Sequence, residues 1–248
     1  LALGTNPDRS TGGARDVPGR ARIPIQEQVV SKTPGWYRGE LNAYSTYHEA
    51  RDGAGKNTVK QLIQRAEKAG LDFLAITDRN SIESFYDPDY KSDKVVLIPA
   101  LEWGDEDRGL ALIYGPHTVP ELADNPFEAQ AIARMIQMQG GIFVVARPCF
   151  PNSPWRWGLG YVNGIQVWCR DFRGVPPLSL NTLRPGYNRA THGPLTDSLH
   201  MAANHGELSA NDQAQRFWDY ELKKGLKASV YGGSGSASAS VPIAQPVT

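Results

Sequence analysis

The sequence predicts an α/β fold in which short apolar strands alternate with helices and the strands form a parallel, barrel-like sheet. Two observations predict it. Near-continuous apolar runs alternate with segments of helical spacing, a pattern typical of a parallel sheet covered by helices. Six or more such units follow one another in a chain of 248 residues. That number suits one closed or nearly closed barrel better than two separate domains.

The first half of the chain supplies the first four strands and the first helix. Residues 39–44 form a short expected strand, and residues 58–69 place apolar side chains at helical spacing. Gly70 then ends the helix, as glycine does at a left-handed cap. Three further apolar runs are expected strands, at 71–77, 95–102 and 111–114.

The second half continues the alternation. Residues 126–139 are an expected helix that ends at Gly140 and Gly141, and residues 141–146 and 164–168 are expected strands. A last helix at 211–225 precedes a last strand at 226–231. In such barrels the chemistry lies where strands end and loops begin, so the polar residues after each strand are the informative ones.

The two ends of the chain differ in composition from this barrel region, which we place at residues 34–240. Residues 1–33 are rich in Gly, Pro, Arg and Ser without a sustained period, and we expect them to form an extended N-terminal arm. The small, polar residues 241–248 are an expected flexible tail.

The composition excludes some partners. Lys and Arg number 26, and so do Asp and Glu. The net charge of zero therefore gives no global field that would attract nucleic acid or a membrane. No apolar run approaches the ~20 residues that span a bilayer. We expect a soluble chain, and no signal peptide is visible, which leaves both a cytoplasmic location and secretion after processing open.

Two cysteines, Cys149 and Cys169, are present without a CxxC motif. Thiolate-based zinc sites need more closely spaced cysteines. Isolated cysteines are more often small buried apolar residues than a bridge. Each follows an expected strand, however, so a disulfide at one rim of the barrel is the less favoured alternative.

Six segments resemble, in the right order, motifs of the PHP (polymerase and histidinol phosphatase) superfamily and, within it, of the CehA/McbA-like metallohydrolases. They cover most of the chain from Gly35 to Ala237. They are WYRGELNAYST at 36–46, GLDFLAITDRN at 70–80, LIPALEW at 97–103, GGIFVVARP at 140–148, YVNGIQVW at 161–168 and FWDYELKKGLKASVYGGSGSA at 217–237. The resemblance implies a distorted PHP-type (βα)7-like barrel in a single domain.

Most positions that hold divalent metals in that family carry other residues here. Glu102, Asp78 and the conservative Glu40 remain in place. The histidines and the terminal aspartate of the family's motifs are replaced by Asn42, Tyr44, Arg79, Leu110, Arg147, Gly235 and Ala237. A catalytic metal site needs about three good ligands and an open position, and arginine cannot coordinate a metal. We therefore expect no tightly bound metal and no other cofactor.

The replacements themselves suggest a different electrostatic arrangement. Removal of divalent cations from a carboxylate cluster leaves buried negative charge. Arginine is always cationic and forms forked bonds to carboxylates. We therefore expect Arg79 and Arg147 to pair with Asp78 and Glu102. The same arginines could grip a carboxylate or phosphate of a substrate.

Other polar and aromatic residues near the strand ends complete the predicted site. Tyr44 could serve as a base if the arginines lower its pKa, or it could be a hydrogen-bonded core tyrosine. His48 could act as an acid or base, or lie in a surface loop. Asn42, Glu40, Asp78 and Arg170 are candidate substrate-binding residues. Trp155 could line an aromatic wall for a sugar, or pack in a local core.

Three functions remain open. The first is a metal-independent lyase or hydrolase acting on an anionic or carbohydrate small molecule. The second is a non-catalytic pseudoenzyme that binds a ligand or a partner. The third is a metal-dependent phosphoesterase or hydrolase. A fold alone does not separate them, because function depends on the site.

Overall fold

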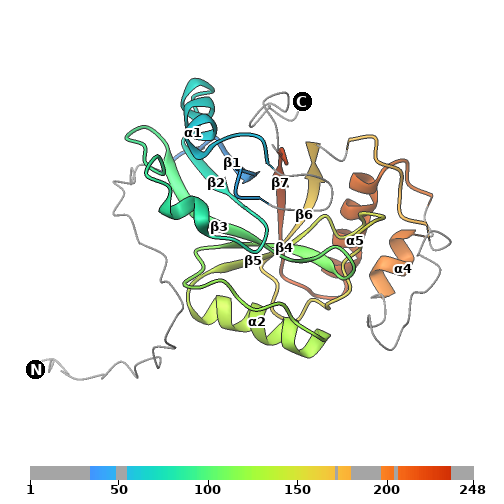
Figure 1. The fold of residues 1–248 in the computed structure, drawn as a ribbon. Helices are drawn as coiled ribbons and strands as arrows, with labels where there is room; N and C mark the ends of the chain where they lie inside the picture. The colour runs from blue at the N-terminus through green and yellow to red at the C-terminus, as the bar shows by residue number, and fades with distance from the viewer. Residues whose placement is uncertain (1–33, 49–54, 171–172, 180–196, 204–205, 236–248) are drawn as a thin grey trace, which may run out of the picture.

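A computed structural model describes residues 34–48, 55–170, 173–179, 197–203 and 206–235 (Figure 1). The expected arm at 1–33 and tail at 241–248 lie outside the described residues. One seven-stranded sheet has its strands in chain order. The strands are β1 (Gly39–Ala43), β2 (Phe73–Ile76), β3 (Val96–Asp105), β4 (Gly109–Tyr114), β5 (Ile142–Ala146), β6 (Gly164–Cys169) and β7 (Ser229–Gly233).

The sheet is parallel except at β4, which pairs antiparallel with both β3 and β5. The expectation of a wholly parallel sheet was therefore wrong at this strand. The turn between Asp105 and Gly109 explains the difference, because a parallel connection needs a crossover of a dozen or more residues. The Asp105 carboxylate accepts hydrogen bonds of 2.8 Å from the backbone N–H groups of Asp107 and Arg108, which stabilises the reversal.

Hydrogen bonds between the two edge strands bring the sheet close to closure. The backbone N–H of Ser234, directly after β7, donates to both carboxylate oxygens of Glu40 in β1, at 3.0 and 3.2 Å. The sheet thus forms a nearly closed barrel, and the expected barrel architecture is confirmed.

The helices begin at residues that cap them. Thr58 and Gln61 form a capping box at α1 (Val59–Lys68), and the Asn125 side chain caps α2 (Pro126–Met138), whose first residue is a proline. Ser209 caps α5 (Ala210–Lys223). The short helices η1 (Glu83–Tyr86) and α4 (Asp197–Ala203) were not expected. Figure 1 shows α4 beside α5, with α1 and α2 elsewhere around the sheet.

Both faces of the central strands are buried. In β4, Ala111 and Ile113 belong to the larger apolar cluster, whereas Leu110, Leu112 and Tyr114 belong to a smaller one with Val144. Successive side chains of a strand point to opposite faces, so the smaller cluster fills the inside of the barrel. The continuous apolar runs in the sequence follow from this double burial.

Two sequence-based alternatives are decided by the core. Cys149 and Cys169 are both buried and form no disulfide, so the disulfide alternative was wrong. Trp155 is also buried in the larger cluster, 1% exposed, and its indole N–H donates to the Gly158 carbonyl at 2.8 Å. The idea that Trp155 lines an aromatic wall for a sugar was therefore wrong. None of the helices in the described ranges has the length and apolarity that a membrane crossing requires.

Candidate functional site

The predicted site residues converge at one end of the barrel, where the parallel strands finish. Tyr44 follows β1, Arg79 follows β2, and Arg147 follows β5. Glu102 lies within β3, which continues three residues beyond it, and an isolated bridge pairs Arg79 with Glu102. We call these four residues the mouth cluster.

The Glu102 carboxylate is the centre of the mouth cluster. Its side chain is fully buried. One oxygen accepts from Arg79 Nε at 2.6 Å, and the other accepts from Arg147 Nη2 at 2.6 Å and from the Tyr44 hydroxyl at 2.9 Å. Burial opposes ionisation, but Arg147 and Arg79 together outweigh it and lower the pKa of Glu102 to about 2. The expected pairing of both arginines with Glu102 is thus confirmed, and Glu102 is a carboxylate at neutral pH.

Asp78 is not part of these ion pairs. Its two oxygens accept from the backbone N–H and the hydroxyl of Ser45, each at 2.7 Å. The expected pairing of Asp78 with an arginine was wrong, because Ser45 already fills both oxygens. Burial raises the pKa of Asp78 to about 6, although the Ser45 hydrogen bonds oppose the rise. Asp78 therefore fixes the start of the loop after β1.

Tyr44 is a buried hydrogen-bond donor. Its hydroxyl donates to Glu102 and accepts from Asn42 Nδ2 at 3.2 Å and from Arg147 Nη1 at 3.3 Å. Burial raises the pKa of Tyr44 well above its usual value, and Arg147 only partly opposes this. Tyr44 is therefore neutral at pH 7. Burial outweighs the lowering of the Tyr44 pKa by the arginines, so its role as a base loses its support.

His48 lies against the mouth cluster and not in an exposed loop. It is 4% exposed, and its ring centroid is 4.1 Å from that of Tyr44. Its Nδ1 accepts a 3.1 Å hydrogen bond from the backbone N–H of Arg79. A ring nitrogen that accepts from an N–H carries no proton, so the neutral ring has its proton on Nε2. This leaves Nε2 as the atom for proton transfer.

The backbone at Arg147 adopts a conformation that residues other than glycine rarely take. Its φ is 48°, in the left-handed region, at the end of β5. A non-glycine residue there is held against a cost of order 1–3 kcal/mol, and such residues are concentrated at functional sites. The fold therefore holds the backbone of Arg147 in this conformation at an energetic cost.

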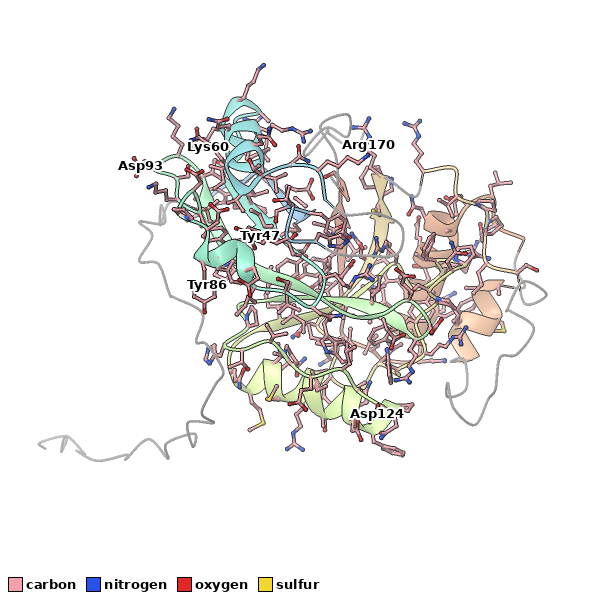
Figure 2. The ribbon with its side chains drawn as sticks, viewed as in Figure 1. Tyr47, Lys60, Tyr86, Asp93, Asp124 and Arg170 are labelled. Carbon is pink, nitrogen blue, oxygen red and sulfur yellow. The ribbon has the colours of Figure 1, made fainter. Side chains whose placement is uncertain are left out.

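Arg170 and Glu40 extend the site in two directions. Arg170 follows β6, and Figure 2 labels it beyond the end of that strand. Its Nη1 is buried without a hydrogen-bond partner in the structure. Glu40 lies deeper, where one of its oxygens also accepts from the backbone N–H of Asn42 at 2.8 Å. Ser45 and Ser234, which hold Asp78 and Glu40, were not among the predicted site residues, although both lie within the quoted motifs.

No protein-family model matches the chain, and no curated protein matches it. Among solved structures, a Bifidobacterium adolescentis protein assigned as a metal-dependent phosphoesterase has a TM-score of 0.50 to this chain, at 13% identity. The alignment covers 85% of this chain and 91% of that chain. This chain folds as a PHP-type barrel. The CehA/McbA-like branch stays a prediction at this identity.

A second PHP-type neighbour is longer. It is a two-domain protein from Bacteroides vulgatus that contains a predicted PHP-like metal-dependent phosphoesterase, with a TM-score of 0.44 and 15% identity. The alignment covers 86% of this chain and 57% of that one. The present chain therefore spans little more than half of that protein's length.

The donors at the mouth of this PHP-type barrel do not fit a resident divalent metal. Both Glu102 oxygens are held by guanidinium groups, and both Asp78 oxygens accept from Ser45. In the described ranges, no three His, Cys, Asp or Glu side chains are grouped so that they could hold a metal ion. A cation placed between Arg79 and Arg147 would also meet like charge.

Proposed function

We propose that this chain is a metal-independent enzyme of the hydrolase or lyase class that binds a small acidic compound at the mouth cluster. The observation that supports the proposal is the charge balance there. Arg79 and Arg147 bring two positive charges, and Glu102, at 2.6 Å from each, brings one negative charge. Among these three side chains one positive charge is left over, at the end of the barrel where the parallel strands finish.

A nearby carboxylate leaves most of this charge available. Glu106 lies 3.7 Å from Arg79 Nη1, and its side chain is 26% exposed. A partly exposed pair at that distance is worth little and is screened by salt. The two arginine side chains are each 10% exposed, so a small part of each reaches solvent. A carboxylate or phosphate that enters there would bond to the N–H groups of the two guanidiniums that Glu102 leaves unused.

His48 is the acid–base group that this geometry favours. It is buried beside both Tyr44 and Arg79, and its Nε2 is the ring atom for proton transfer. The solved neighbour's assignment as a phosphoesterase makes hydrolysis of a phosphate ester the first reaction to test. A lyase reaction would use the same arginines to neutralise a substrate carboxylate.

A non-catalytic ligand-binding protein is the second candidate. The raised pKa of Tyr44 favours it, because a neutral buried tyrosine cannot act as a base. Turnover decides between the two. Phosphate esters and acidic sugars that bind should be consumed in the presence of EDTA, as followed by nuclear magnetic resonance. His48→Gln should abolish turnover with little change in affinity. Binding without any turnover would instead support the second candidate.

If the two arginines bind the acidic compound, variants that keep their charge but not their shape should bind it more weakly. Titration calorimetry with inorganic phosphate and with cyclohexanecarboxylate should show binding to the unmodified chain. Arg147→Lys and Arg79→Lys should each weaken it at least about tenfold, because lysine keeps the charge but loses the fork. Arg134→Lys, on the exposed face of α2, is the matched control and should bind as tightly as the unmodified chain. Equal affinity in all four proteins would show that Arg79 and Arg147 do not bind the anion.

A further inference from the structure

A buried glutamine inside the barrel has no partner for either end of its amide. Gln166 in β6 is 1% exposed, and neither its oxygen nor its nitrogen has a hydrogen-bond partner in the structure. The register between β6 and β7 shifts between Gln166 and Trp168, and such irregularities re-aim side chains next to binding sites. A buried amide without a partner costs free energy, and a ligand group that both donates and accepts would relieve that cost.

The side chains of Glu40 and Asn42 lie close to Gln166 beside Gly233, and Ser234 follows Gly233 in the chain. The Ser234 hydroxyl is buried, also without a partner, while its backbone N–H donates to Glu40. A Cβ added to Gly233 would lie 3.2 Å from both Gln166 Nε2 and Glu40 Oε1, and 2.7 Å from the Asn42 Cβ. These side chains therefore converge on Gly233, where only glycine leaves room for them. We call Glu40, Asn42, Gln166 and Ser234 the polar floor.

One residue joins the polar floor to the mouth cluster. The backbone N–H of Asn42 donates to Glu40 at 2.8 Å, and its side-chain nitrogen donates to the Tyr44 hydroxyl at 3.2 Å. Tyr44 in turn donates to Glu102 at 2.9 Å. The polar floor is therefore linked through Asn42 to the residues that would hold the charged end of a compound at Arg79 and Arg147.

We infer that the acidic ligand of the mouth cluster is polyhydroxylated, as in a sugar acid, and that Gln166 and Ser234 bind its hydroxyl groups. This inference rests on the proposed function, because the mouth cluster must first hold the acidic group. A hydroxyl both donates and accepts, and so matches an amide oxygen, an amide nitrogen and a serine hydroxyl together. A simple anion or an apolar acid would leave all three buried atoms without partners.

Two ring acids of similar size separate the inference from the function on which it rests. D-glucuronate and cyclohexanecarboxylate both offer one carboxylate on a six-membered ring, but only the first carries hydroxyl groups. Calorimetric titration of the unmodified chain should show D-glucuronate binding about tenfold more tightly, as one or two net hydrogen bonds allow. Gln166→Leu and Ser234→Ala should each reduce this preference and leave the affinity for cyclohexanecarboxylate unchanged.

A matched buried glutamine provides the control. Gln213 is also 1% exposed, but its amide bonds to both the N–H and the carbonyl of Leu178, at 2.6 and 2.9 Å. Gln213→Leu should lower the melting temperature and keep the preference for D-glucuronate. Gln166→Leu should not lower the melting temperature, because it removes no hydrogen bond within the protein.

Each result has a defined meaning. If the unmodified chain binds both acids equally, the inference fails while the arginine site stands. A preference that survives in both Gln166→Leu and Ser234→Ala also overturns the inference. If neither acid binds, the proposed function and the inference fail together. A Gln166→Leu protein that is less stable than the unmodified chain would show that the amide is bonded within the fold.

Discussion

Replacement of Glu102 by glutamine is expected to lower the free energy of unfolding by about 3–5 kcal/mol. Glutamine has nearly the same shape, so the packing of β3 is kept. The two guanidinium groups at 2.6 Å from the carboxylate would, however, face each other without a neutralising charge. Breaking a buried ion pair is costly because it leaves an uncompensated charge in a low-dielectric interior. Urea unfolding followed by circular dichroism measures the loss.

Glu106 provides the control for this prediction. It also pairs with Arg79, but at 3.7 Å and with a side chain 26% exposed. Glu106→Gln should therefore cost no more than about 1 kcal/mol. If Glu102→Gln were as mild as Glu106→Gln, the arginines would not depend on Glu102, and the mouth cluster would not be a charge-neutralising unit.

The free energy of unfolding is expected to reach its maximum near pH 4. The folded-state pKa of Asp78 is raised from 3.8 to about 6. Its protonation therefore stabilises the fold as the pH falls through 6, and this contribution is complete below 3.8. The pKa of Glu102 is lowered from 4.5 to about 2. Its contribution is present above 4.5 and is lost as the pH falls toward 2. Each of these two contributions to the free energy of unfolding amounts to about 3 kcal/mol when it is fully present.

Single substitutions should remove separately the rise in unfolding free energy above pH 4 and its fall below pH 4.5. Asp78→Asn keeps an oxygen for the Ser45 N–H and should flatten the rise in unfolding free energy between pH 7 and pH 4. Glu102→Gln should flatten the fall below pH 4.5. Asp93→Asn, at an exposed position labelled in Figure 2, should change neither the rise nor the fall. A stability curve for the unmodified chain that falls steadily from pH 7 to pH 4 would contradict the burial of Asp78.

The alternation of strands and helices could be predicted because both faces of the sheet are covered. Runs such as β4 and β5, buried on both sides, are continuously apolar in sequence, and capping residues such as Thr58 mark the helix starts. The direction of β4 could not be predicted in the same way. Periodicity gives the burial of a strand but not its direction, which here depends on the short turn before Gly109.

The pairing of Glu102 with both arginines could be predicted because residues at the carboxyl ends of the parallel strands of a barrel meet at one rim. The partner of Asp78 could not, because Ser45 reaches it through the backbone path of the loop after β1. The prediction for Trp155 was wrong because an aromatic residue in a loop has the same sequence signature whether it lines a ligand site or packs in a core. Gln166 did leave a signal, a polar residue inside the apolar run GIQVW.

The metal content of the purified chain shows whether arginine side chains or a metal ion neutralise the Glu102 carboxylate. We propose that Arg79 and Arg147 do so. Inductively coupled plasma mass spectrometry of protein purified without chelators should find far less than one zinc, manganese or iron ion per chain. Addition of manganese or EDTA should leave the melting temperature unchanged. One or more ions per chain, lost in Glu102→Gln, would contradict the account.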